Sequence, residues 1–129
     1  MLDTDAGRDN GSRSLVFDAA IARLLELLGF GVELATCVTC RTQLIPQGNA
    51  MNIIRGGVEC GRCCEATAMA IAPETIKAMR FLRSEQLADI AQLGMPPRIR
   101  GDVAFITDLL LTHHLESRFS ALYYLKQVL

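Results

Sequence analysis

Two Cys-x-x-Cys pairs constrain the fold of this chain more than any other feature of its sequence. The pairs are Cys37/Cys40 and Cys60/Cys63, and residues 41–59 separate them. A Cys-x-x-Cys turn brings two sulfurs to one ion, so the second pair must return beside the first to complete a tetrahedral site. We therefore predict one structural zinc ion (Zn2+) held by four thiolates. Such a closed coordination sphere leaves no open position for a substrate or a catalytic water.

A fifth cysteine leaves the identity of the fourth ligand open. Cys64 follows Cys63 directly, so Cys60 and Cys64 offer a Cys-x-x-x-Cys alternative. We favour Cys63 because two identical turns make a more regular site. Two other interpretations of the cysteines are disulfides or a redox-active pair, and inert buried thiols. A thioredoxin-like pair would need an alternating strand and helix pattern, and neither pair has one around it.

The residues between the two pairs have the pattern of a hairpin. Residues 50–54 form a short apolar run, Gly56 and Gly57 follow as a turn, and Val58 leads back to Cys60. We therefore predict a zinc-ribbon β-hairpin within residues 37–64.

The rest of the chain has helical spacing. A first helix is expected to be capped by Ser14 and to end at Gly29. Its expected apolar side consists of Phe17, Ile21, Leu24, Leu25 and Leu28, with Arg23 and Glu26 pointing outward.

Three further helices are expected after the ribbon, followed by a last amphipathic segment. Pro73 opens the first of them, and its apolar side is Ile76, Met79 and Leu82. Ser84 is expected to cap a short helix that ends near Gly94. Residues 95–101 are expected to form a loop before Asp102, which caps the most apolar helix. Residues 120–129 form the last segment.

These patterns predict a mostly α fold, a small helical bundle with an inserted zinc-ribbon β-hairpin. One domain is expected over residues 14–129, behind a flexible leader at residues 1–13 that is rich in Asp, Gly, Asn and Ser. The leader lacks the apolar core of a signal peptide, and no apolar run is long enough to span a membrane. Reduced, zinc-binding cysteines are typical of the cytoplasm.

Charge alone does not identify a nucleic-acid-binding protein here, because the net charge of the 129 residues is −1. Aromatic residues make up 5% of the chain and tryptophan is absent, so few side chains can stack on bases. The alternative is that the basic residues form an ordinary solvated surface. The candidates for phosphate contact are Lys77, Arg80, Arg83, Arg98 and Arg100, with Arg55 and Arg62 on the ribbon.

No catalytic constellation is visible in the sequence, so we predict that the chain is not an enzyme and has no small-molecule substrate. His113 and His114 are adjacent on an apolar helix and point about 100° apart, which favours packing or capping over shared metal binding. Asp108 and Glu116 lack an evident nucleophile, and no phosphate loop, GxSxG or HExxH motif occurs.

Four stretches, taken in order, resemble one known family. They are FDAAIARLLELLGFGVELATCVTC (17–40), NIIRGGVECGRC (52–63), APETIKAMRFLR (72–83) and LLLTHHLESRFSAL (109–122). They are similar to the carboxy-terminal part of the RecO family of DNA repair proteins, which are bacterial recombination mediators. The resemblance covers about residues 14–125 and implies a helical domain with an inserted zinc ribbon.

The resemblance also implies a function and partners. Family members help to load the RecA recombinase onto strands coated by single-strand-binding protein, anneal complementary strands and work with RecR. They begin with an OB-fold domain, which is missing here, so we expect a fragment, a split gene product or a truncated homologue. Each Cys-x-x-Cys turn, or knuckle, usually has a glycine directly after its second cysteine. Arg41 and Cys64 occupy these two positions here. The alternative function is a stand-alone zinc-ribbon adaptor for protein contacts, unrelated to repair.

Overall fold

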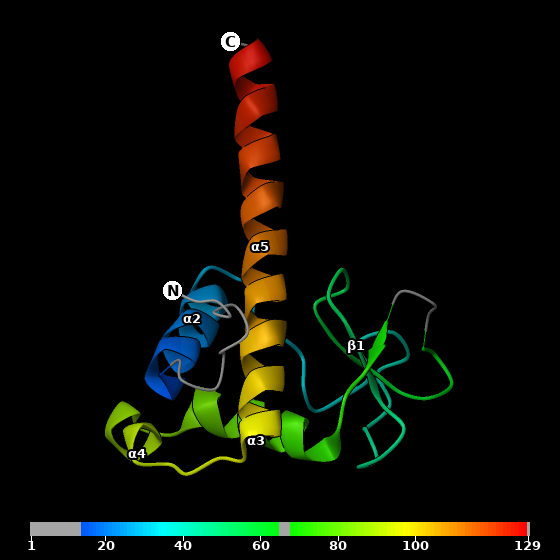
Figure 1. Ribbon diagram of the computed structural model, residues 1–129. Helices are drawn as coiled ribbons and strands as arrows, with labels where there is room; N and C mark the ends of the chain where they lie inside the picture. The colour runs from blue at the N-terminus through cyan, green and yellow to red at the C-terminus, as the bar shows by residue number, and fades with distance from the viewer. Residues whose placement is uncertain (1–13, 65–67, 129) are drawn as a thin grey trace.

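The computed structural model describes residues 14–64 and 68–128, with the side chains of residues 117–126 left out of the description. The predicted leader at residues 1–13 lies outside the described residues. Helices α2, α3 and α4 surround the lower part of a long helix, α5, and a small sheet lies on the other side of α5 (Figure 1). The prediction of a mostly α fold with an inserted ribbon is confirmed.

Helix α2 (Leu15–Leu27) begins where the sequence predicted. The Ser14 hydroxyl accepts a hydrogen bond from the Val16 amide, and Gly29 follows the helix with a φ of 91°. The predicted buried face was only partly right: Leu25 is buried and Ile21 packs against the core. The core side of α2 is made by Leu15, Asp18, Ala19 and Leu25, whereas Phe17, Leu24 and Leu28 are about half exposed.

Arg23 of α2 does not point outward as predicted. Its guanidinium donates to the Leu82 carbonyl at 2.8 Å and also to the Glu85 carbonyl. These carbonyls lie at the end of α3, where backbone acceptors lack helical partners and a cation is favourable for the dipole. Arg23 therefore connects α2 to the end of α3.

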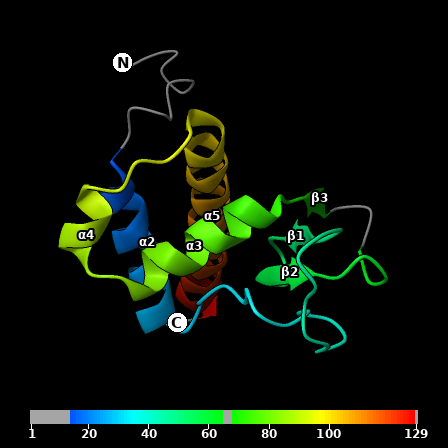
Figure 2. The same cartoon turned by 90° about the horizontal axis from the view of Figure 1, so that it is seen from below.

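Helix α3 (Pro73–Ser84) begins at the predicted proline and buries the predicted side chains, Ile76, Met79 and Leu82. It begins beside the sheet, lies across the base of α5 and ends near α2 (Figure 2). The next boundary was predicted wrongly. Ser84 does not cap the following helix, because it is the last residue of α3 and its hydroxyl donates to the Arg80 carbonyl. The short helix α4 (Leu87–Ala91) is preceded by Gln86 instead.

Helix α5 (Pro97–Val128) is longer than predicted at both ends. It begins at Pro97, so residues 98–101 are helical rather than part of a loop, and Asp102 is inside the helix. Asp102 accepts a hydrogen bond from the Thr75 hydroxyl at 3.4 Å. The backbone continues without a break through residues 120–128, which were predicted as a separate segment. Its core side chains are Ile99, Val103, Ala104, Ile106 and Leu110.

The inserted ribbon contains three short antiparallel strands, one more than a hairpin. Strand β1 (Ala50–Asn52) lies between β2 (Gly57–Glu59) and β3 (Met69–Ala70). The segment between α2 and Cys37, residues 28–36, is called the linker here and pairs with the sheet. The Glu33 amide donates to the Gly56 carbonyl, and the Glu33 carbonyl accepts from the Val58 amide, both at 2.9 Å.

The double glycine serves two different purposes. Gly56 has a φ of 78°, which the turn between β1 and β2 requires and which disfavours other residues. Gly57 has no positive φ, but a β-carbon there would lie 2.8 Å from the β-carbon of Glu33. The linker can approach the sheet only because Gly57 has no side chain.

Within the described ranges, no helix has the length and apolar character that a membrane crossing requires.

Candidate metal centre

Four cysteine sulfurs converge at one end of the ribbon. The sulfurs of Cys37, Cys40, Cys60 and Cys63 all lie within 4.8 Å of one another, and those of Cys40 and Cys60 are 3.8 Å apart. None of the cysteines is in a disulfide. A zinc ion with four Zn–S bonds of about 2.3 Å would hold its sulfurs roughly 3.8 Å apart. The donor set and its spacing fit zinc.

The first knuckle is a tight turn closed by backbone hydrogen bonds. The Arg41 amide donates to the Cys37 carbonyl at 2.9 Å, and the Cys37 amide donates to the Thr42 carbonyl at 2.8 Å. Arg41 has a φ of 67°, a left-handed conformation that is costly for a residue with a β-carbon. Glycine usually takes this position of a knuckle because it adopts such a φ without strain. Arg41 occupies it here, in agreement with the departure noted in the sequence.

Cys37 is fully buried, and three amides surround its sulfur. The backbone amides of Thr39, Cys40 and Cys60 each donate to Sγ at 3.4 Å. Burial raises the pKa of this thiol, but the amide hydrogen bonds outweigh it and lower the pKa to about 6. The site is therefore arranged for a thiolate, the form that binds a metal.

The pKa values of Cys40 and Cys63 are shifted in opposite directions. A hydrogen bond from the Thr42 hydroxyl helps to lower the pKa of Cys40. The pKa of Cys63 is raised to about 12, because its thiol is held by hydrogen bonds to the sulfurs of Cys40 and Cys60, with burial adding to the effect. Four thiolates repel one another, so a dication among them would favour full deprotonation.

Cys64, the alternative fourth ligand, is exposed and is not among the four clustered sulfurs. The cluster contains Cys63, the cysteine that the regular spacing favoured.

Glu59 is a site residue that the sequence reasoning missed. It is fully buried beside Cys60, and its carboxylate accepts hydrogen bonds from the Thr39 hydroxyl at 2.5 Å and the Asn52 amide at 3.2 Å. Arg55 approaches the same carboxylate at 3.7 Å. Glu59 therefore fastens the first knuckle to the hairpin. No signal in the sequence marked it, because a glutamate in a short strand usually points to solvent.

Glu33 has a similar structural role in the linker, where its carboxylate also accepts several hydrogen bonds. Its carboxylate accepts hydrogen bonds from the Ala35 amide, the Thr36 amide and the Thr36 hydroxyl, at 3.1 to 3.2 Å. The bonds from the two backbone amides lower the pKa of this carboxyl below its ordinary value. The turn that leads into Cys37 is thus held by a carboxylate on the linker.

The five basic residues predicted to contact nucleic acid do not share one role in the fold. Arg80 and Arg83 reach from α3 to the linker and donate to the carbonyls of Leu34 and Val32, respectively. Lys77 is exposed on the same helix, while Arg98 and Arg100 lie at the start of α5. Arg55 and Arg62 are on the ribbon. Contact of any of these residues with nucleic acid stays a prediction.

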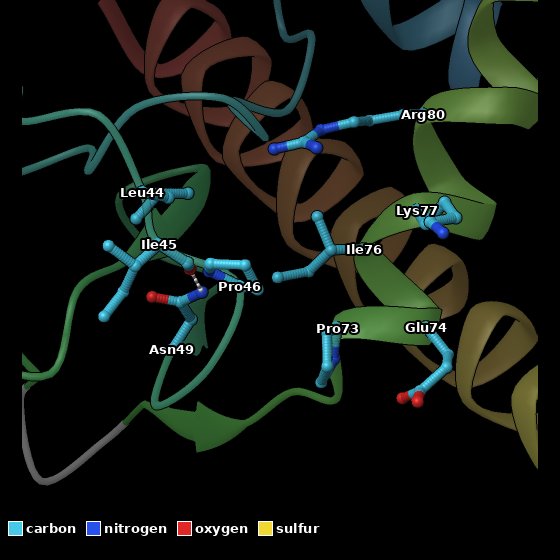
Figure 3. Close-up of a pocket in the computed structure, with 9 residues that line it drawn as sticks. All are labelled: Leu44, Ile45, Pro46, Asn49, Pro73, Glu74, Ile76, Lys77 and Arg80. Atoms are coloured by element: carbon cyan, nitrogen blue, oxygen red, sulfur yellow. Dashed lines mark hydrogen bonds between the residues drawn. The ribbon is translucent and has the colours of Figure 1, made fainter.

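A cavity of about 330 Å³ lies between the ribbon and α3 (Figure 3). The α3 side provides Pro73, Glu74, Ile76, Lys77 and Arg80, and the ribbon side provides Leu44, Ile45, Pro46 and Asn49. Ile45 is 68% exposed. The cavity therefore combines apolar walls with two cationic side chains and one carboxylate.

The two histidines pack rather than meet a metal. The ring of His114 stacks on Phe30 at a centroid distance of 4.4 Å, and His113 meets His114 edge-on. Burial, followed by the neighbouring His113, lowers the pKa of His114. Both lie in the middle of α5 and not near its end, so of the two predicted roles capping is wrong, whereas packing agrees with the contacts.

Comparison with known proteins gives one family. The model of the family "Recombination protein O C terminal" matches residues 7–122. A curated relative, "DNA repair protein RecO" of Roseiflexus sp. (strain RS-1), is 27% identical over 107 residues. That match covers 81% of this chain and 38% of the relative, so the chain corresponds to well under half of the relative's length. No solved structure matches the chain.

Proposed function

The chain belongs to the family of recombination protein O C-terminal domains, and on that premise we propose that it is the zinc-binding module of a recombination mediator in DNA repair. The main observation in favour of a zinc site is the convergence of four sulfurs within 4.8 Å. The three amides around Cys37 support it, since they stabilise a thiolate. Zinc would close the ribbon and act in folding rather than in chemistry.

The metal site is joined to the helical body through the linker. The linker pairs with β2 at Glu33, and its carbonyls at residues 32 and 34 receive hydrogen bonds from α3. We infer that zinc sets the position of the ribbon against α3, and so the shape of the cavity between them. A module of this kind acts by presenting a surface and not by catalysis.

The proposed partners are RecR and single-strand-binding protein, in the cytoplasm, with single-stranded DNA as a weaker, salt-sensitive ligand. The cavity lined by Lys77, Arg80 and Ile45 supports a protein partner, because basic and apolar groups meet there. Few aromatic residues are available for base stacking, so we expect protein contacts to contribute more than DNA.

A pair of cysteine variants tests the zinc module. Cys37→Ser removes a buried ligand and is expected to abolish metal binding and reduce thermal stability. Cys64→Ser, outside the cluster, is the matched control and is expected to keep both. Equal metal content in the two variants would refute the assigned ligand set.

Capture experiments test the repair role. The wild-type chain and Cys64→Ser should retain purified RecR or single-strand-binding protein, and Cys37→Ser should retain less. If the wild type binds zinc but neither protein, the stand-alone adaptor becomes the better account.

A further inference from the structure

The four clustered sulfurs differ in how far their residues are open to solvent. Cys37 is fully buried, and three backbone amides donate to its sulfur. Cys40 is exposed, whereas Cys60 and Cys63 are partly exposed. An oxidant that arrives from solvent therefore meets Cys40 before Cys37. Because thiolates rather than thiols react with oxidants, sulfurs that are arranged to bind a metal are also open to oxidation wherever solvent reaches them.

A second cavity brings small molecules to the same side of the cluster. It has a volume of about 400 Å³ and lies within the ribbon, between residues 42–48 and the second knuckle. Its lining includes Cys60 and also Thr42, whose hydroxyl is 2.9 Å from the sulfur of Cys40. The cavity has room for several molecules of the size of water, and hydrogen peroxide is little larger. A peroxide can therefore reach the part of the cluster where Cys40 and Cys60 lie.

The sulfurs of Cys40 and Cys60 are well placed to join in a disulfide. They come from different knuckles and lie 3.8 Å apart. A disulfide bond is about 2.05 Å long, so closing the gap moves each sulfur by about 0.9 Å. A disulfide within the first knuckle would instead pull Cys37 away from the three amides that donate to its sulfur. The geometry therefore favours a disulfide between the knuckles.

We propose that hydrogen peroxide oxidises Cys40, that Cys60 then forms a disulfide with it, and that the ribbon releases its metal as a result. The thiolate of Cys40 attacks one peroxide oxygen, the O–O bond breaks, and a sulfenic acid and a hydroxide form. The thiolate of Cys60 then attacks the oxidised sulfur and displaces a second hydroxide. The two sulfurs lose two electrons and the peroxide gains them, and two protons from solvent convert the hydroxides to water.

This inference rests on the proposed zinc site and describes how that site would be regulated. After oxidation, Cys37 and Cys63 remain as ligands, and two thiolates do not complete a tetrahedral site. Loss of zinc would free the ribbon from its position against α3 and so change the surface between them. A thiol reductant would reverse the disulfide. Disulfides in the cytoplasm of most organisms are transient in this way and report redox state.

Zinc release under peroxide tests the proposal. The metal-loaded chain is treated with hydrogen peroxide beside a zinc-sensitive dye, and its thiols are counted after denaturation. One zinc ion should leave each chain as the thiol count falls from five to three, since one disulfide uses two thiols. Dithiothreitol should restore both values. Peptide mapping should find the disulfide between Cys40 and Cys60.

The outcomes distinguish this inference from the proposed function. A chain that contains zinc and keeps it in peroxide would overturn the inference and leave the zinc module standing. Zinc release without a disulfide between Cys40 and Cys60 would also overturn it. A chain that binds no zinc at all would refute the proposed zinc module, and with it this inference.

Two variants test the route without removing a ligand. Thr42→Val deletes the hydroxyl that donates to the sulfur of Cys40, so the variant should still bind one zinc ion. That sulfur should become more nucleophilic, and zinc release should be roughly threefold faster. Cys64→Ser removes an exposed cysteine outside the cluster and should release zinc at the wild-type rate. Unchanged or slower release from Thr42→Val, or clearly slower release from Cys64→Ser, would contradict attack at Cys40.

Discussion

Replacing Arg80 or Arg83 with alanine is expected to destabilise the whole fold, whatever these residues do with nucleic acid. Each guanidinium donates to a carbonyl of the linker, at Leu34 and Val32 respectively. The side chains of those two linker residues are 1% and 7% exposed, so water has little access to the segment. Without the arginine, a carbonyl in a buried segment loses its donor.

The size of the effect follows from the type of bond. A hydrogen bond to a charged group contributes about 1.5–3 kcal/mol, and we take the lower part of that range because Arg80 is an exposed residue. Each single variant should therefore lose about 1.5 kcal/mol in free energy of unfolding. Both bonds hold the same linker, so the double variant should lose about 3 kcal/mol, with some departure from additivity.

Urea denaturation followed by circular dichroism measures these losses. Lys77→Ala is the matched control, because it removes an exposed cation from the same helix and should change stability by less than about 0.5 kcal/mol. The reasoning is refuted if Arg80→Ala and Arg83→Ala cost no more than Lys77→Ala. If the reasoning holds, reduced DNA binding by an arginine variant is evidence of a DNA contact only when its fold is shown to be intact.

Two further predictions concern the knuckle and the histidines. Arg41→Gly should raise the free energy of unfolding by about 0.5–1 kcal/mol in urea denaturation, because glycine adopts the φ of 67° without strain; an unchanged or lower value would contradict the strain argument. The pKa of His114 is lowered in the fold, so the unfolded chain binds its proton more readily. Stability should therefore fall as pH drops below about 6.5, and His114→Phe should reduce that dependence in thermal melts at several pH values; an identical pH dependence in the variant would contradict it.

Short-range signals explain why much of the fold could be predicted. Ser14, Gly29 and Pro73 act on the backbone within a few residues of themselves, so the limits of α2 and the start of α3 were readable from the sequence. The spacing of the cysteines requires their sulfurs to meet, because two knuckles can share an ion only if the chain returns.

The errors arose where a contact distant in the sequence decides the outcome. Leucines surround α2, so the pattern could not show that Leu25 faces the core while Leu24 faces solvent. Arg23 appeared to belong to a solvated face, but its partners lie about sixty residues away. Asp102 has the character of a cap, yet α5 begins five residues earlier because Pro97 is favourable at a helix start.

The site was also only partly predictable. The four cysteines could be found from their spacing, but the buried carboxylate of Glu59 could not, since its partners are Thr39 in the first knuckle and Asn52 in strand β1. The same is true of Gly57, whose role depends on the close approach of Glu33.

The metal content of the purified chain tests the central claim most directly. Elemental analysis of protein prepared without chelators should give one zinc ion per chain, and removal of that ion should unfold the ribbon and lower thermal stability. A chain that contains no zinc, and whose helix content and melting temperature are the same with and without chelator, would contradict the account.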